Sequence, residues 1–323
     1  MDFSDFKTGK DDEGRRLDKV VRIFISDTAL SAIYKSIRKG LIKVNGSKAA
    51  PDYRIQDGDV ITIADVLLKS DGKGAPAVET SAVAKEIISA ADAIKMIEKI
   101  RVFENGHLLV LNKPAGMNVH ASQKDEISLQ AVVQAYYKAS VSNDSLSFKP
   151  GPLHRIDKYT SGLVCFSKST QGAVWFSQNM KEHKIKKTYE AVLQGHLDSA
   201  QEWIDYLEKE DNSEGLDSFH TVKVYASDDA SRPQQANQCI TKVIPERFEE
   251  RNGTPLTLAK IQIETGRQHQ IRAQSAFHGF PLWGDTAYGG NKTDQYGGQF
   301  YLVAKEIEFP VNELDIPLVL QVK

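Results

Sequence analysis

Hydrophobic residues near the N-terminus follow the spacing of two short helices. Four apolar side chains recur at intervals of three and four positions, which places them on one helix face: Leu17, Val20, Val21 and Phe24. A second helix is predicted between Ser31, a residue type that caps helices, and Gly40, which suits the left-handed conformation at a helix end. The pattern therefore predicts two helices within the first forty residues.

A short hairpin pattern follows these helices. Residues 41–44 are predicted to form a strand that turns at Asn45-Gly46, the strongest short-range hairpin signal. A return strand is expected through Tyr53 and Ile55, and a further turn leads into a strand over residues 60–63. Together with the helices, these strands make a small α/β module.

The chain divides into four segments. The polar and acidic residues 1–13 are expected to be a flexible tail, and residues 14–63 form the compact module. Residues 64–101 are predicted to be a linker, rich in glycine and small polar residues at first, with an amphipathic helix over residues 82–100. Residues 102–323 form the large domain.

The large domain contains more strand than helix. Strands are predicted over residues 107–112, 188–194 and 256–264, and Ser169 or Thr170 is expected to cap a helix. Because the strands come in runs and not in regular βαβ units, the predicted fold class is α+β with a mixed, largely antiparallel sheet.

Composition excludes several classes of protein. Of the 323 residues, 41% are hydrophobic and 26% are charged, which is ordinary for a soluble globular protein. No apolar run is long enough to cross a bilayer, and no secretory signal is visible at the N-terminus. Two cysteines and eight histidines show no metal-ligand spacing. We therefore expect a cytoplasmic, monomeric protein with no membrane association and no metal.

The net charge of −2 hides a local excess of positive charge. Nine basic residues and two acidic ones lie between Arg15 and Lys48. Such a patch suits phosphate contacts, although a merely solvated face would have the same composition. The candidate RNA-binding residues are Arg15, Arg16, Lys19, Lys35, Arg38, Lys39 and Lys43.

Three stretches of the large domain differ from ordinary core. Residues 154–163 (HRIDKYTSGL) place Asp157 on a loop before an apolar strand, a suitable place for a catalytic carboxylate, although such aspartates more often form turns or ion pairs. Residues 186–189 (KKTY) carry Tyr189, either a buried aromatic or a surface on which a base stacks. Residues 265–272 (TGRQHQIR) are expected to open a helix.

That helix is predicted to start at Thr265-Gly266 and to stop at Gly279. Gln268, His269 and Arg272 would share a face of it, because they are three and four residues apart. The group suits anion or phosphate recognition at a helix start, and an exposed polar helix is the alternative.

Taken together, these stretches closely resemble the RluA-like family of pseudouridine synthases. The family signature HRLDxxTSG occurs here with Ile156 at the leucine position, KxY occurs as residues 187–189, and GRxHQIR as residues 266–272. Supporting matches are LNKPAG at residues 111–116 and the later Gly284-Asp285 and Tyr288-Gly289. The likeness spans about residues 102–310. Two positions depart from the family: Gln268 stands where threonine is usual, and LVA at residues 302–304 replaces LHA.

The N-terminal module resembles the S4-type RNA-binding module. The matching segments are RLDK at residues 16–19, IRKGLIKVNG at residues 37–46 and GDVI at residues 58–61. This combination is similar to the branch of the family, RluC- and RluD-like, that modifies large-subunit ribosomal RNA.

The resemblance implies that the chain isomerises uridines in structured RNA without a cofactor. It makes Asp157 the catalytic carboxylate and Arg272 its bidentate partner. Tyr189 would stack on the target uracil, and Arg155 would fill the space that the flipped nucleotide leaves. Two other functions stay open: an RNA-binding or ribosome-assembly factor that keeps the fold without catalysis, and a hydrolase that uses Asp157 with His154 or His269.

Overall fold

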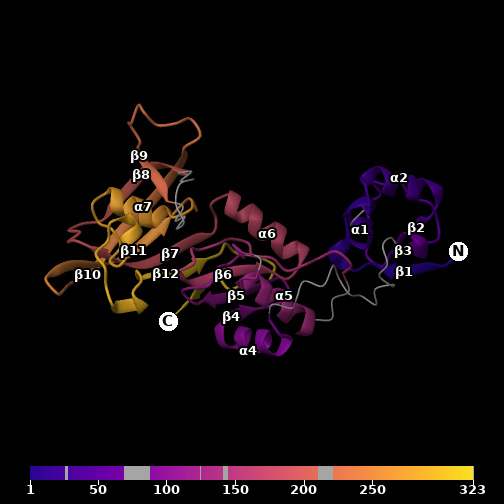
Figure 1. The fold of residues 1–323 in the computed structure, drawn as a ribbon, viewed down its shortest axis with the longest axis horizontal. Helices are drawn as coiled ribbons and strands as arrows, with labels where there is room; N and C mark the ends of the chain where they lie inside the picture. The colour runs from indigo at the N-terminus through magenta and orange to yellow at the C-terminus, as the bar shows by residue number, and fades with distance from the viewer. Residues whose placement is uncertain (26–27, 69–87, 124, 141–144, 210–220, 323) are drawn as a thin grey trace.

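The computed structural model describes residues 1–25, 28–68, 88–123, 125–140, 145–209 and 221–322. Within them, a small N-terminal module lies at one end of the long axis and a large sheet-based domain fills the rest (Figure 1). None of the described helices is long and apolar enough to span a membrane.

The N-terminal module packs two helices against a three-stranded sheet. Its elements are β1 (Phe3–Lys7), the 3-10 helix η1 (Lys10–Asp12), α1 (Leu17–Phe24), α2 (Leu30–Lys39), β2 (Ile42–Val44), β3 (Val60–Ala64) and α3 (Asp65–Leu68). The strand order is β1-β3-β2, and both pairings are antiparallel. The apolar face predicted for the first helix lies in the core, where Leu17, Val20 and Val21 are fully buried.

The second predicted helix is also present. Its N-cap is Ala29, two residues before the expected Ser31. The helix ends at Gly40, whose φ of 76° is the left-handed conformation predicted for it. Asn45 and Gly46 both have positive φ, 50° and 75°, as a tight hairpin turn requires.

Two expectations for this module are wrong. The residues expected to be a flexible tail include β1, which pairs along the whole of β3 and places Phe6 against the core and the ring of Phe24. The expected return strand through Tyr53 and Ile55 does not form, because β3 occupies the position beside β2. Ile55 is nevertheless fully buried and contributes to the core as part of a loop.

The large domain is built on one extended sheet. Its strands are β4 (Arg101–Glu104), β5 (Leu108–Lys113), β6 (Ser161–Ser167), β7 (Lys186–Gln194), β8 (Gln201–Lys209), β9 (Val222–Ala226), β10 (Asn237–Arg251), β11 (Thr254–Ile263), β12 (Leu302–Glu308) and β13 (Val319–Gln321). The order is β4-β5-β6-β12-β7-β11-β10-β8-β9, with β13 paired to β12. Only β6 and β12 pair in parallel among the described strands, so the predicted mixed, largely antiparallel sheet is confirmed.

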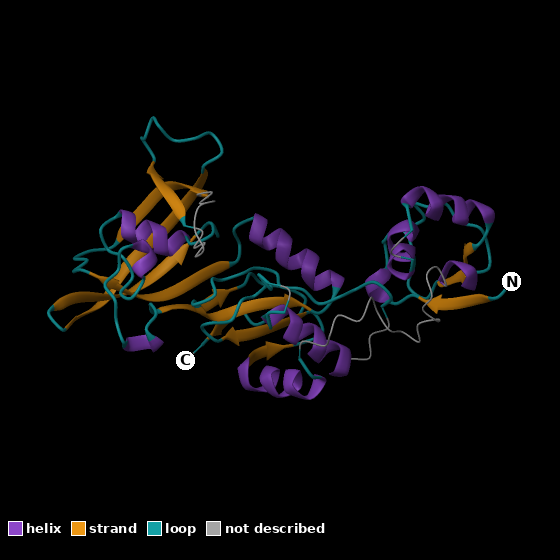
Figure 2. Cartoon of the chain, viewed as in Figure 1, coloured by secondary structure: helices purple, strands orange, loops and turns teal. Residues whose placement is uncertain are grey.

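Helices cover parts of this sheet (Figure 2). They are α4 (Ala90–Ile100), α5 (Leu129–Ser140), α6 (Thr170–Lys181) and α7 (Gln270–Phe277), with short 3-10 helices η2 (Thr286–Tyr288) and η3 (Gln295–Gly297). The helix predicted over residues 82–100 is present as α4 from Ala90 onward, with Ser89 as its N-cap. Residues 82–87 of that prediction lie outside the described residues. Ser169 is the N-cap of α6, where its side chain accepts from Gly172 N.

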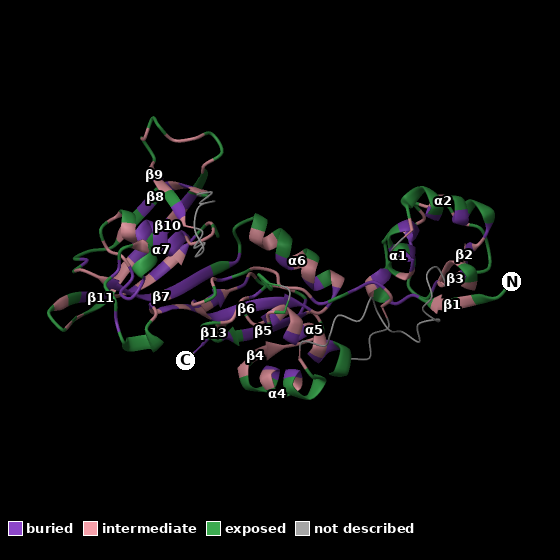
Figure 3. Cartoon of the chain, in the orientation of Figure 1, coloured by how far each residue is buried: buried purple, intermediate pink, exposed green. Residues whose placement is uncertain are grey.

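The core of the large domain lies along the central strands. Strands β5, β6 and β7 are buried along nearly their whole length (Figure 3), as strands covered on both faces are. A sheet held in this way is a rigid base, and the residues described next lie on β5, on β7, on α7 and on loops beside them.

Candidate active site

The loop that carries Asp157 is fastened to β6 on its N-terminal side. Leu153 N donates to the Cys165 carbonyl oxygen at 2.8 Å, and Cys165 N donates to Nε2 of His154 at 3.1 Å. Burial, together with the nearby charge of Lys187, lowers the pKa of His154 to about 3, so the ring is neutral and can accept that hydrogen bond. His154 is therefore an anchor of the loop and not a free base.

Asp157 lies where this loop turns toward β6. Its side chain is 20% exposed, while the neighbouring Ile156 is buried in the core. Thr160 N donates to the carbonyl oxygen of Asp157 at 3.2 Å and closes the turn. At Gly162, where φ is 109°, a Cβ would collide with the backbone of Ala304 on β12, so only glycine allows the strand to follow the loop so closely.

A buried lysine supports the same loop from β5. Lys113 is fully buried, and its Nζ donates to the carbonyl oxygens of Pro114, Met117 and Lys158 at 2.9, 2.8 and 2.9 Å. Burial lowers the pKa of Lys113 to about 8, and the negative charge of Asp157 opposes that shift. Because Lys158 directly follows Asp157, this ammonium group holds the backbone beside the carboxylate.

Arg272, on α7, faces two carboxylates. Its Nε and Nη2 donate to the two oxygens of Asp285 at 2.6 and 2.9 Å, and its Nη1 lies 3.7 Å from Oδ2 of Asp157. The guanidinium also lies over the rings of Tyr288 and Phe300, with 4.9 and 4.7 Å to the centroids. These contacts fix the plane of the guanidinium and leave one edge toward Asp157.

The ion pair predicted between Arg272 and Asp157 is present, but the bidentate contact predicted for it is wrong. The planar fork of an arginine can match only one carboxylate with two parallel hydrogen bonds, and Asp285 occupies that position. Asp285 is 2% exposed and needs both donors, whereas Asp157 is partly open to solvent. Asp157 is thus attracted by the cation without being enclosed by it.

His269 lies on the other side of Asp157. Its Nε2 is 4.0 Å from Oδ1 of Asp157, and its Nδ1 is 2.9 Å from the hydroxyl of Tyr288. That hydroxyl accepts from Val222 N at 3.0 Å, which leaves its own proton for Nδ1 of His269. Burial lowers the pKa of His269, although Asp157 opposes the shift. The network therefore assigns a neutral ring whose Nε2–H faces the Asp157 carboxylate.

The predicted helix face formed by Gln268, His269 and Arg272 does not exist. Helix α7 begins at Gln270, and His269 precedes it with a φ of 54°. The side chain of Gln270 explains the late start, because its Oε1 accepts from Arg267 N and from Oγ1 of Thr265 and holds residues 265–269 as a turn. Of the three predicted residues, His269 and Arg272 still meet at Asp157.

Tyr189 lies on β7, between Ile261 of β11 and Ala304 of β12. It is 7% exposed. Burial raises the pKa of its hydroxyl, and the charge of Asp157 raises it further. The phenol stays protonated over the physiological range. The neighbouring Lys187 is buried too, so the basic cluster predicted at this position is exposed only at Lys186.

The remaining predicted residues lie at the surface. Arg155 is exposed on the Asp157 loop, close enough for its charge to act on His269. Five of the seven basic residues of the module are exposed: Arg15, Lys19, Lys35, Arg38 and Lys39. The other two have internal contacts, since Arg16 pairs with Asp18 at 2.9 Å and Nζ of Lys43 lies 5.2 Å from the centre of the Phe3 ring.

Sequence reasoning gave no role to Lys113, Asp285 or Tyr288. All three lie in segments that match the family, so the signal was present, but a motif does not tell which partner a side chain contacts. Within the part of the chain that the structure describes, no group of three or more His, Cys, Asp or Glu side chains could hold a metal ion.

The chain is similar to known proteins along most of its length. Residues 107–277 match the family model described as RNA pseudouridylate synthase, and residues 15–61 match that of the S4 domain. The ribosomal large subunit pseudouridine synthase C of Vibrio cholerae is 27% identical over 93% of this chain and 86% of its own length. The uncharacterized RNA pseudouridine synthase YlyB of Bacillus subtilis is 26% identical over 93% of this chain and 87% of its own.

A solved structure shares the fold. The human RNA pseudouridylate synthase domain containing 4 covers 72% of this chain and 91% of its own, with a TM-score of 0.55 and 19% identity. The family model spans more than half of the 323 residues and contains Asp157, Tyr189 and Arg272. The chain therefore belongs to the RNA pseudouridylate synthase family, with an S4 domain at its N-terminus.

Proposed function

We propose that this isomerase converts uridines of large-subunit ribosomal RNA to pseudouridine, with Asp157 as its catalytic carboxylate. The observation that carries the proposal is the position of Asp157, which is partly exposed and 3.7 Å from the buried Arg272. The ribosomal substrate is supported by the name of the Vibrio cholerae relative, which matches nearly the whole chain. A ribosomal substrate agrees with the cytoplasmic location expected from the sequence.

The reaction breaks the bond between uracil N1 and ribose C1′ and forms a bond between C5 and C1′. The proton on C5 is released and N1 gains one, so the reaction is neither a redox step nor a transfer to another molecule. A carboxylate suits this chemistry because positive charge develops on the sugar as the glycosidic bond opens. Asp157 would act on the ribose, and the guanidinium of Arg272 would face it from 3.7 Å.

The surrounding residues can hold the nucleoside. A uridine in folded RNA must first leave its stack, which costs a few kcal/mol. Tyr189 would receive the uracil against its ring, and Arg155, exposed on the same loop as Asp157, would occupy the vacated space. Asp285 does not act on the RNA in this scheme. It orients Arg272, because it takes both donors of the guanidinium fork.

The five exposed cations of the module, together called its basic face below, would bind the RNA backbone. They are available for phosphates, and each phosphate contact releases counterions without reading sequence. Base selection would therefore depend on the partly exposed site formed by Asp157, His269 and Arg272, called the cleft below, and on how the RNA is presented to it.

The test is Asp157→Asn, which keeps the size of the side chain and removes its charge. We expect no detectable release of tritium from ribosomal RNA labelled at C5 of uridine, with RNA affinity close to that of the parent. Asp198→Asn is the control, because Asp198 is 90% exposed and outside the cleft. Turnover near the parent value in Asp157→Asn would contradict the assignment. If the parent binds ribosomal RNA but never modifies it, the non-catalytic binding factor is the correct function.

A further inference from the structure

A buried aspartate joins the N-terminal module to the large domain. Asp12, in η1, is fully buried. Its Oδ1 accepts from Ser145 Oγ at 2.8 Å, from Ser147 N at 3.0 Å and from Ser147 Oγ. Its Oδ2 accepts from Leu146 N at 2.8 Å and from Gly9 N at 3.0 Å. Four of these five donors belong to the large domain.

The preceding aspartate makes a second contact with the large domain. Oδ1 of Asp11 accepts from Thr170 N at 2.7 Å, and the carbonyl oxygen of Asp11 accepts from Thr170 Oγ1 at 3.0 Å. Thr170 is the first residue of α6. The backbone N–H groups in the first turn of a helix have no partner within the helix. An acidic side chain is favourable at this helix end. We refer to the contacts of Asp11 and Asp12 together as the aspartate latch.

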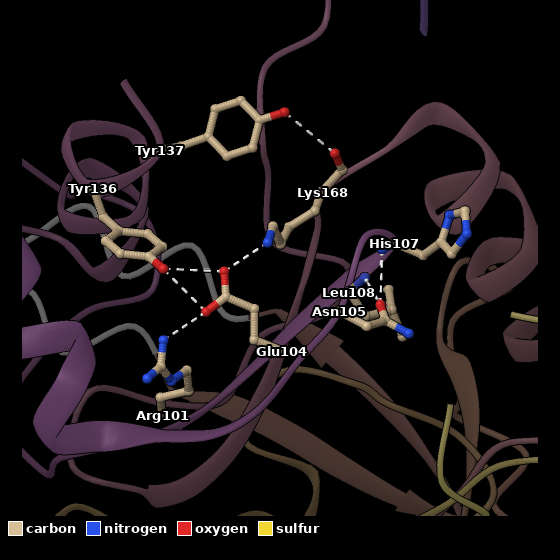
Figure 4. Close-up of polar contacts among 8 residues, drawn as sticks. All are labelled: Arg101, Glu104, Asn105, His107, Leu108, Tyr136, Tyr137 and Lys168. Atoms are coloured by element: carbon tan, nitrogen blue, oxygen red, sulfur yellow. Dashed lines mark hydrogen bonds and ion pairs between the residues drawn. The ribbon is translucent and has the colours of Figure 1, made fainter. Parts of the chain in front are cut away.

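The surface that receives the latch is itself held in place. Nζ of Lys168, two residues before Thr170, lies 2.6 Å from Oε1 of Glu104, and the Tyr136 hydroxyl donates to the same carboxylate (Figure 4). Nδ1 of His107 is 2.9 Å from Oγ of Ser169. The start of α6 is thus tied to the turn between β4 and β5, and it can act as a fixed support.

On the other side, η1 is tied to the body of the module. Thr8 N donates to the Asp59 carbonyl oxygen at 2.8 Å before η1, and Gly14 N donates to the Ile55 carbonyl oxygen at 2.8 Å after it. Leu146, which lies between the two latch serines, packs against the hydrophobic core of the module. Polar and apolar contacts therefore bridge the same junction between the module and the large domain.

We propose that Asp11 and Asp12 are positioning residues that hold the basic face of the module at a set distance and orientation from Asp157, and thereby select the uridines that reach the cleft. The proposal rests on the RNA-binding role of the module given above. Two surfaces of a protein that bind the same RNA increase its affinity together only when the distance between them matches the distance between their two sites on the RNA. The latch supplies that geometry, which a linker alone would leave variable.

The first experiment measures the junction directly and needs no RNA. Cysteines introduced at the exposed Ser31 on α2 and Ser177 on α6 carry spin labels in the full-length protein, in which both native cysteines are buried. We expect one narrow distance distribution for the parent and a broad one for Asp11→Ala/Asp12→Ala. Asp57→Ala, at an exposed turn of the module, is the matched control and should keep the narrow distribution. A broad distribution in the parent, or an unchanged one in the double variant, overturns the proposal.

The second experiment connects the junction to substrate choice. On a long ribosomal RNA fragment, we expect Asp12→Ala to lower kcat/KM at least about tenfold, because the two surfaces no longer act together. On a short stem-loop that occupies the cleft alone, the rate should stay within about twofold of the parent. Equal losses on both substrates, in a protein that still melts like the parent, contradict a role in presentation.

A milder variant covers the case in which Asp12→Ala does not fold. Thr170→Val keeps the shape of the side chain and removes the hydroxyl that donates to Asp11. We expect it to broaden the label distances less than the double variant does and to spare the stem-loop rate; unchanged distances count against the latch. If Asp157→Asn stays active, the catalytic assignment fails while the distance measurement still decides the latch.

Discussion

The basic module and the cleft around Asp157 use positive charge in opposite ways. In the module, the five exposed cations make no ion pair with any residue that the structure describes, and solvent surrounds them. In the cleft, Arg272 is buried, paired with Asp285, and enclosed by the rings of Tyr288 and Phe300. The exposed cations of the module are available to a partner. The contacts of Arg272 instead fix the orientation of its guanidinium group.

Because of this difference, we expect the two regions to control different quantities, RNA affinity in the module and reaction rate at Asp157. Exposed charges act on a polyanion over the Debye length, so salt weakens them and no single one is essential. A buried cation acts over a few ångströms in a fixed direction and loses its effect if its geometry changes. Changes in the cleft should therefore alter the rate, and changes in the module should alter binding.

Among the variants that leave Asp157 intact, the largest effect is expected for Arg272→Lys. Lysine keeps the charge but cannot make two parallel hydrogen bonds to Asp285 while facing Asp157. We expect single-turnover isomerisation to fall about 100- to 1,000-fold, with RNA affinity nearly unchanged. Arg267→Lys is the matched control, because Arg267 is exposed in the turn before α7. A rate within a few-fold of the parent would show that the two-pronged contact is not needed.

The next effect concerns Lys113 and pH. The folded protein lowers the pKa of Lys113 from 10.5 to about 8, so between these values the unfolded chain binds more protons than the folded one. The contribution of Lys113 to unfolding free energy therefore rises as pH increases from 8 to 10.5, in total by on the order of 3 kcal/mol.

Comparison with Lys113→Met isolates this term. We expect chemical unfolding to show that the unfolding free energy of the parent, relative to that of the variant, is larger at pH 10 than at pH 7.5. At pH 7.5 the variant should also lose activity, since the carbonyl oxygens of Met117 and Lys158 lose their donor. Parallel pH profiles for the two proteins would contradict a buried, perturbed ammonium group.

Local patterns predicted much of the fold. The first helix follows from the spacing of Leu17, Val20 and Val21, and the cap of α6 follows from Ser169, because both depend on neighbours a few residues away. Strand β1 could not be predicted in this way. Its partner residues in β3 are about sixty positions later, and its short polar sequence has no face that demands burial until Phe6 meets the core.

At the site, too, sequence motifs identify residues but do not give the contacts between distant segments. Motifs identified Asp157, Tyr189 and Arg272, and the structure brings them together. No motif states that the fork of Arg272 belongs to Asp285, or that Gln270 delays the start of α7 and turns His269 toward Asp157. Those facts depend on which buried acceptor needs two donors, and this is decided only when the segments pack.

A smaller effect is expected at Tyr189, where ring and hydroxyl can be separated. Tyr189→Phe keeps a surface for stacking, whereas Tyr189→Ala removes one worth about 1–3 kcal/mol per base. We therefore expect Tyr189→Phe to retain much more activity than Tyr189→Ala, measured by pseudouridine formation under single-turnover conditions. Equal losses in both variants would assign the essential role to the hydroxyl, not to the ring.

The smallest effect is expected for the exposed cations of the module. Arg38→Ala/Lys39→Ala removes two of them at the end of α2 without touching the core. If both contact phosphates, the slope of log affinity against log salt should become shallower by about 1 per residue, and affinity should fall alike for related RNA sequences. The rate with saturating RNA should not change.

Lys95→Ala/Lys99→Ala on α4 is the matched control for that variant, because it removes the same number of exposed charges from the large domain. If only the α2 variant changes the salt slope, the module contributes a defined phosphate contact. If the two variants change it equally, overall charge and not the basic face governs binding, and the contrast between module and cleft is weaker than proposed. If the α2 variant instead slows the saturated rate, the two cations act on the reaction step and not on binding alone.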